Sequence, residues 1–161
     1  MKSETAAFFA KSREFPDKAK ELFDAHHWPD EAGRAAYLAG LHAAQALIFE
    51  RTGKVIKRHR GVQRELARLV KEEPRFDMEL RAFLGRTYNL KAIADYETDP
   101  GSQVTFEQAQ EAINTAERLV GCIEEFLEWR LCRSALPLQP GPLTRGSTGR
   151  VIYSRGASAR W

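Results

Sequence analysis

The sequence has few cysteines and no long apolar run, and these absences exclude several classes of protein. Two of its 161 residues are cysteines, Cys122 and Cys132, and they fit no zinc or redox spacing. A secreted disulfide scaffold needs more cysteines than this. No apolar run approaches the roughly 20 residues that a helix needs to cross a bilayer. The stretch MKSETAAFFAKSREF is too charged for a signal peptide, so we expect a cytoplasmic protein without a membrane segment.

Patterns that define metal and cofactor sites are also missing. The sequence has no glycine-rich phosphate loop and no defensible Ser/His/Asp set. Its histidines, cysteines and carboxylates show no spacing typical of metal ligands. We therefore expect neither a metal nor a cofactor.

Strand signals are nearly absent, whereas helical periodicity recurs along the chain. Apolar residues repeat at spacings of three and four, which is typical of amphipathic helices. We predict an all-α, up-and-down bundle of four to five helices. The first starts at Ser3, which can cap it, and the second runs from Pro29 to Gly53. The others are expected over about 60–72, 77–96 and 105–133.

Several residues mark the ends of these predicted helices. Pro29 suits a first helical turn, and Gly53 can take the left-handed conformation that ends a helix. Thr105 and Gln108 have the spacing of a capping box. Pro16 falls inside the first helix and should kink or divide it, because proline has no backbone N–H to donate.

The positive charge is concentrated at the C-terminal end of the sequence. The net charge is +3, but residues 134–161 contain four arginines and no acid, so residues 1–133 carry about −1. The same segment is rich in glycine and proline and has no helical period. We predict one bundle domain over 3–133 and a flexible, disordered basic tail over 134–161.

The stretch YLAGLHAAQALI places His42 inside an apolar seam of the second helix. Its neighbours in this seam are alanines and Phe49. Imidazole acts as an acid or a base near neutral pH, so His42 is a candidate catalytic residue. The alternative is a structural histidine, hydrogen-bonded inside the bundle by Tyr37 or by an acid on a neighbouring helix. The apolar neighbours favour this alternative.

A basic cluster follows at the bend before the third helix. Arg58, His59 and Arg60 stand there with Lys54 and Lys57. A helix N-terminus binds anions, and a bound anion would offset the repulsion between these cations and the helix dipole. We predict that Arg58 and Arg60 bind phosphate or RNA, and that His59 is a second catalytic candidate. The alternative is a solvated basic loop in which His59 caps the helix.

Lys91 and Asp95 lie four residues apart on one face of the fourth helix. We predict that Lys91 binds phosphate, and that Asp95 and Tyr96 orient it or a histidine of the bundle. The alternative is a simple i,i+4 ion pair, which stabilises a helix by about 0.3–0.5 kcal/mol. Arg34 is expected to face solvent.

Three motifs in fixed order go beyond a generic bundle: YLAGLHAAQALI (37–48), RHRGVQREL (58–66) and LKAIADYE (90–97). Together they resemble the HEPN family of small prokaryotic helical proteins over about residues 5–127. The resemblance implies a homodimer with a positively charged site near the dimer groove. It also implies a toxin–antitoxin or defence setting, often beside a nucleotidyltransferase that acts as the antitoxin.

The resemblance leaves two functions open, metal-independent ribonuclease and non-catalytic binder of RNA or nucleotides. The ribonucleases have a signature of an arginine, four to six residues, and a histidine. Here seven residues separate Arg34 from His42, and seven separate Arg51 from His59. We predict RNA or nucleotide binding, with cleavage if His42 and His59 share one cleft. The alternatives are a non-catalytic module that pairs with a nucleotidyltransferase or another protein and, more weakly, a bundle without a nucleic-acid ligand.

Overall fold

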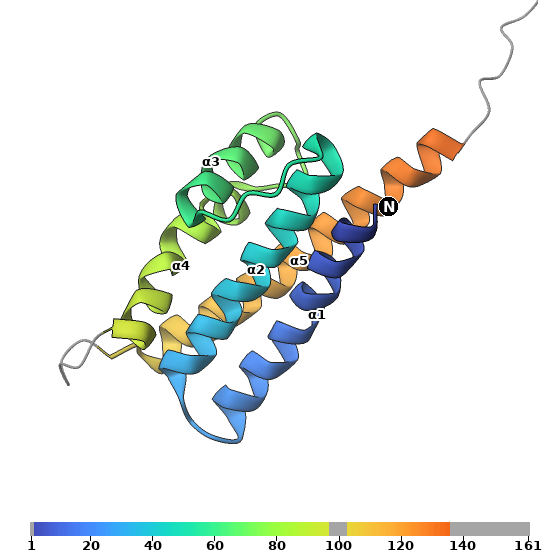
Figure 1. Ribbon diagram of the computed structural model, residues 1–161. Helices are drawn as coiled ribbons and strands as arrows, with labels where there is room; N and C mark the ends of the chain where they lie inside the picture. The colour runs from blue at the N-terminus through green and yellow to red at the C-terminus, as the bar shows by residue number, and fades with distance from the viewer. Residues whose placement is uncertain (1, 97–102, 136–161) are drawn as a thin grey trace, which may run out of the picture.

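The computed structural model describes residues 2–96 and 103–135, and all regular structure within these ranges is α-helical. This confirms the all-α prediction. No helix in these ranges is both long and apolar enough to span a membrane. The predicted tail lies outside the described residues, apart from the last two residues of the fifth helix. The helices are α1 (Ser3–Asp24), α2 (Pro29–Thr52), α3 (His59–Val70), α4 (Met78–Tyr96) and α5 (Phe106–Ala135) (Figure 1).

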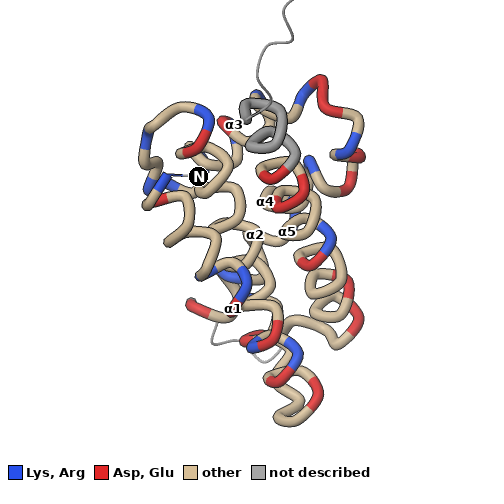
Figure 2. The backbone as a smooth tube through the Cα atoms, turned by 90° about the vertical axis from the view of Figure 1, so that its right-hand side faces the viewer, with Lys and Arg blue, Asp and Glu red and all other residues tan. Residues whose placement is uncertain are grey.

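Helix α2 lies at the centre of the bundle (Figure 1). It contacts each of the other four helices, whereas α1 and α4 have no contact with each other within the described ranges. Charged residues lie on the surrounding helices, and the middle of α2 has none (Figure 2). Most buried residues of α2 are small, so its neighbours can approach closely. They are Ala32, Gly33, Ala35, Ala36, Tyr37, Ala39, Gly40, Leu41, Ala43, Ala44, Ala46, Leu47 and Ile48.

The closest approach to α2 occurs at Gly40. A Cβ atom at this position would lie 2.4 Å from Cε1 of Phe83 and 3.2 Å from Cδ2 of Leu119. Both of these side chains are buried in the core. The distance to Phe83 is too short for any Cβ, so glycine allows α4 to pack directly on the backbone of α2.

The predicted helix ends are confirmed at three places. Pro29 lies in the first turn of α2, and Gly53 follows its end with a φ of 69°. Before α5, the Thr105 N–H donates to Oε1 of Gln108 over 3.0 Å. The Gln108 N–H donates to Oγ1 of Thr105 over 3.2 Å, which completes the capping box.

Two details of the first helix differ from the prediction. Of the two effects predicted for Pro16, a kink or a division of the helix, the division is not observed, because α1 runs unbroken through this residue. Pro16 is buried, and the packing of α1 along α2 outweighs the local cost of a helical proline, about 3 kcal/mol. Ser3 is the first helical residue and not the cap, because Lys2 occupies the capping position. The Ser3 hydroxyl donates to the carboxylate of Glu4 over 2.6 Å.

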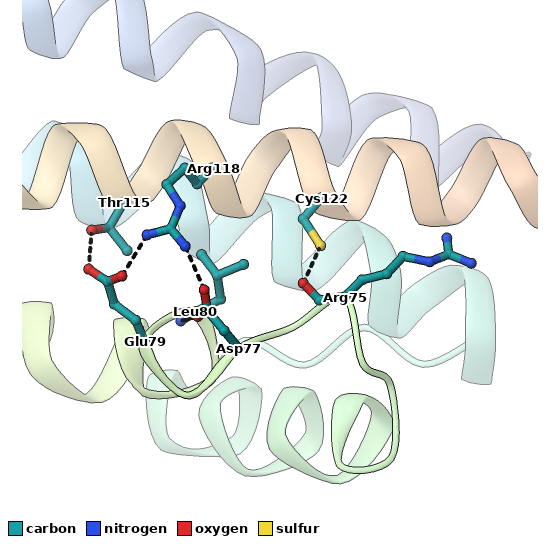
Figure 3. Close-up of polar contacts among 7 residues, drawn as sticks. All are labelled: Arg75, Asp77, Glu79, Leu80, Thr115, Arg118 and Cys122. Carbon is teal, nitrogen blue, oxygen red and sulfur yellow. Dashed lines mark hydrogen bonds and ion pairs between the residues drawn. The ribbon is translucent and has the colours of Figure 1, made fainter.

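A polar network fixes the start of α4 against α5 (Figure 3). The Arg118 guanidinium donates to Asp77 and Glu79, each over 2.5 Å, and the Thr115 hydroxyl donates to Glu79 over 3.1 Å. Asp77 also accepts the N–H of Leu80 over 2.8 Å, which caps α4. This N–H lowers the pKa of Asp77, and the Arg118 guanidinium lowers the pKa of Glu79. The network thus joins the N-terminal end of α4 to α5.

We expect Gly40→Ala to lower the free energy of unfolding by about 1–3 kcal/mol, because the added methyl group overpacks the core against Phe83. Gly85→Ala is the matched control, since a Cβ at this position of α4 meets nothing within 4 Å. Alanine is favoured over glycine inside a helix by about 1 kcal/mol, so this variant should be more stable than the wild type. Urea denaturation measures both. Equal stability of Gly40→Ala and Gly85→Ala would contradict the close packing, because both variants gain the same helix propensity.

Candidate functional site

His59 begins α3 and lies between α2 and α4. Its Nδ1 atom is 2.6 Å from the hydroxyl oxygen of Tyr37. The imidazole stacks on the Tyr37 ring and is tilted against the Tyr88 ring, with centroid distances of 5.7 Å in both cases. Tyr37 is fully buried and His59 half-buried, so this hydrogen bond lies at the edge of the core. The alternative in which His59 caps α3 is not observed, because Arg58 holds the capping position.

Regular helical spacing brings the other side chains to the same place. On α2, Arg34 and Tyr37 are three residues apart. On α4, Tyr88, Lys91 and Asp95 follow at spacings of three and four. Residues at these spacings share one face of a helix. The two facing surfaces therefore present aromatic rings toward His59 and charged groups next to it.

The connection between α2 and α3 determines where His59 lies. The Gln45 side chain of α2 donates to the carbonyl oxygen of Ile56 over 2.9 Å. Gly61 lets Ile56 lie against α3, since a Cβ at 61 would be only 2.8 Å from Cγ2 of Ile56. These contacts tie the connection to both helices and hold the start of α3 beside Tyr37.

Two cations and one carboxylate form the charged part of the site. The Arg34 Nε–H donates to Oδ1 of Asp95 over 2.7 Å. The ammonium group of Lys91 donates to Oδ2 of the same carboxylate. The bond from Lys91 lowers the pKa of Asp95 most, and the bond from Arg34 lowers it further. Asp95 is therefore ionised at neutral pH. The structure thus adds an ion pair with Asp95 to the solvent-facing position expected for Arg34, whose side chain is 40% exposed.

The surroundings of His59 favour its neutral form. Burial lowers its pKa most, the Lys91 charge lowers it further, and the Asp95 charge opposes this. Burial also raises the pKa of Tyr37, so its hydroxyl stays protonated. Among the described residues, only Nδ1 of the imidazole has a hydrogen bond. A neutral imidazole whose Nε2 has no hydrogen bond to a described residue can take up or give a proton near neutral pH.

A cleft of about 530 Å³ lies at the bend that precedes and opens α3. Arg58 and Arg60, the predicted phosphate ligands, both line this cleft and flank His59 in the chain. Four of its lining residues are cations and one is an acid, so it favours an anionic ligand. The lining residues are Val55, Ile56, Lys57, Arg58, Arg60, Gly61, Arg64 and Glu65.

The structure does not bring His42 together with His59 in one chain. His42 stacks on the rings of Phe8 and Phe15 of α1, at centroid distances of 6.5 and 5.5 Å. Its Nδ1 atom is 3.0 Å from Oε1 of Gln45, and burial lowers its pKa. Within the described ranges, α1 contacts neither α3 nor α4. These contacts match the structural alternative for His42, with Gln45 as its partner.

Two tyrosines of the site are not among the predicted site residues. The sequence suggests Tyr37 as a partner of His42, but five residues turn an α-helix by about 140°, so the two side chains point to different faces. Tyr88 belongs to none of the three motifs. The signal for it is its spacing of three and seven from Lys91 and Asp95. The side chain of Tyr96 lies outside the described residues.

An all-helical bundle with a tyrosine-bound histidine beside several cations defines the class of this protein. Among the described residues, no group of three or more histidines, cysteines or carboxylates could hold a metal ion. The model of the HEPN domain matches residues 5–126. The chain therefore belongs to the HEPN domain family, as its three motifs predicted. No curated protein matches it in a sequence comparison.

We expect Lys91→Met to raise the pKa of His59, because the Lys91 ammonium disfavours a second positive charge nearby. Titration of the imidazole signals by NMR measures this shift. Lys20→Met is the control, since Lys20 pairs with Glu117 on α5 and does not contact the site. An unchanged or lower His59 pKa in Lys91→Met would contradict the described arrangement.

Proposed function

We propose that this chain binds the phosphate groups of RNA or of a nucleotide around His59. The observation that carries this proposal is the hydrogen bond between the buried Tyr37 hydroxyl and Nδ1 of His59. It fixes the imidazole at the edge of the core and directs the opposite nitrogen, Nε2, to a ligand. Lys91 acts directly on this imidazole, and the basic cleft lined by Arg58 and Arg60 lies next to it in the chain, which suits a polyanion.

Each cation has a separate place in this proposal. Arg58 and Arg60 contact phosphates in the cleft at the bend, where the N-terminus of α3 adds its own attraction for anions. Lys91 contacts the phosphate next to His59, because its charge acts directly on the imidazole. The bases are not fixed by these contacts, so binding should depend little on sequence.

His59 is the residue that we assign to acid–base chemistry. Cleavage of RNA without a metal needs a base for the 2′-hydroxyl, an acid for the leaving oxygen and a cation for the developing charge. The described part of one chain places a single imidazole at this site. We propose a homodimer, in which the second copy supplies the other imidazole. The contacts of His42 favour a structural role.

The second candidate function is a non-catalytic module in the same kind of system. The spacing of seven residues in both arginine–histidine pairs favours it, because the ribonuclease signature has four to six. Such a module would bind RNA or a nucleotide at the same place and pair with a nucleotidyltransferase or another protein. Both versions belong to a toxin–antitoxin or defence setting in the cytoplasm.

We expect His59→Ala to reduce RNA cleavage by roughly 10²-fold or more, because it removes the only proton carrier assigned to this site. His42→Ala is the matched histidine control and should cleave like the wild type. Labelled single-stranded RNA is incubated with each protein, and circular dichroism checks the fold. RNA that is bound but never cut would support the non-catalytic module. RNA that is neither bound nor cut would contradict the proposed function.

Arg58→Ala and Arg60→Ala should each weaken RNA binding and flatten its salt dependence. The slope of log K against log salt should fall by roughly 0.7 for each phosphate of a single strand that the variant no longer neutralises. Lys71→Ala at the other end of α3 is the control, because its side chain is 80% exposed and lies beside Glu72. Fluorescence anisotropy at several salt concentrations measures the slopes. Equal slopes for all four proteins would exclude the cleft from RNA binding.

A further inference from the structure

Asp95 occupies the space between two cations of the His59 site. Its two carboxylate oxygens bind different partners, since Oδ1 accepts from Arg34 of α2 and Oδ2 accepts from Lys91 of α4. The Lys91 and Asp95 side chains are only 16% and 20% exposed, so solvent screens this pair less than a surface pair. The carboxylate therefore joins two helices through the same groups that would attract a phosphate.

The geometry of this carboxylate resembles that of a bound phosphate. Two oxygens of one anion each take a separate N–H donor, and a phosphate group would engage the same two donors in the same manner. Asp95 is ionised at neutral pH because Lys91 and Arg34 lower its pKa. A negative charge thus already lies where the substrate would place one.

We infer that Asp95 is an internal counter-anion of the His59 site, which an incoming phosphate displaces from Arg34 and Lys91. This inference rests on the proposed function and deepens it, because it names the residue that sets the affinity for the phosphate. With Asp95 in place, part of the attraction of both cations is already satisfied, so single phosphates bind weakly. Displacement of Asp95 removes the partner that these two side chains share, and the phosphate takes its place.

A different role for Asp95 gives the opposite result. If the carboxylate orients Arg34 and Lys91 for the ligand, its removal leaves two mobile side chains and weakens binding. If it competes with the ligand, its removal strengthens binding. The sign of the change in affinity therefore distinguishes competition from orientation.

The experiment compares Asp95→Asn with the wild type in binding a short, fluorescein-labelled single-stranded RNA by anisotropy. We expect roughly five-fold tighter binding, the scale of one partly exposed ion pair. Glu31→Gln is the matched control, because Glu31 lies 3.8 Å from Arg34 on α2. This variant also removes one negative charge next to Arg34, but it leaves the bonds from Arg34 and Lys91 to Asp95 in place. This control should change the affinity by less than about two-fold, since an exposed ion pair at the surface contributes little.

Weaker or unchanged binding by Asp95→Asn, or an equal gain in Glu31→Gln, would overturn the inference while leaving the proposed function intact. No RNA binding by either the wild type or Asp95→Asn would overturn both. If Asp95→Asn does not fold, the wild type provides the test. The side-chain carboxyl ¹³C signal of Asp95 is followed during titration with inorganic phosphate. A shift that saturates supports displacement, and a constant signal while the phosphate binds contradicts it.

Discussion

The buried hydroxyl group of Tyr37 is the constraint on which the site depends. A buried hydroxyl group without a hydrogen-bond partner lowers the stability of the fold by about 1–3 kcal/mol. Tyr37 is fully buried, and His59 provides its partner. This requirement fixes the start of α3 against α2. It thereby also fixes the position of the basic bend, which joins directly to this start. Arg58 and Arg60 of the bend therefore flank, in the chain, an imidazole whose orientation is set from the core.

Central burial of α2 separates the two histidines and gives each a different environment. His42 turns toward α1, where two phenylalanine rings enclose it. Tyr37 turns toward α3 and α4, where it meets His59 and Tyr88. Small residues along α2 let these helices approach from several sides at once. His42 thus packs against aromatic rings, whereas His59 is hydrogen-bonded to a buried tyrosine and lies close enough to Lys91 for the charge of Lys91 to lower its pKa.

Membership of the HEPN domain family agrees with a role in handling RNA or nucleotides, and the geometry refines it. The charged part of the site is partly neutralised, because the single carboxylate of Asp95 binds both Arg34 and Lys91. The cleft at the bend has four cations and one acid. In our proposal, a ligand with several phosphates contacts this cleft, and one of its phosphates displaces Asp95 beside the imidazole.

Local rules in the sequence determined the helices, their ends and the family. Three signals act over only a few residues, so they can be recognised from the sequence alone. They are the proline at the start of α2, the glycine after α2 and the Thr105–Gln108 capping box. The motifs also named His59, Arg58, Arg60, Lys91 and Asp95. Only the tertiary structure decided the partners: Tyr37 binds His59 rather than His42, and the partly exposed Arg34 binds Asp95. These pairs join residues 22 and 61 positions apart, so helix packing, and not sequence spacing, sets their distances.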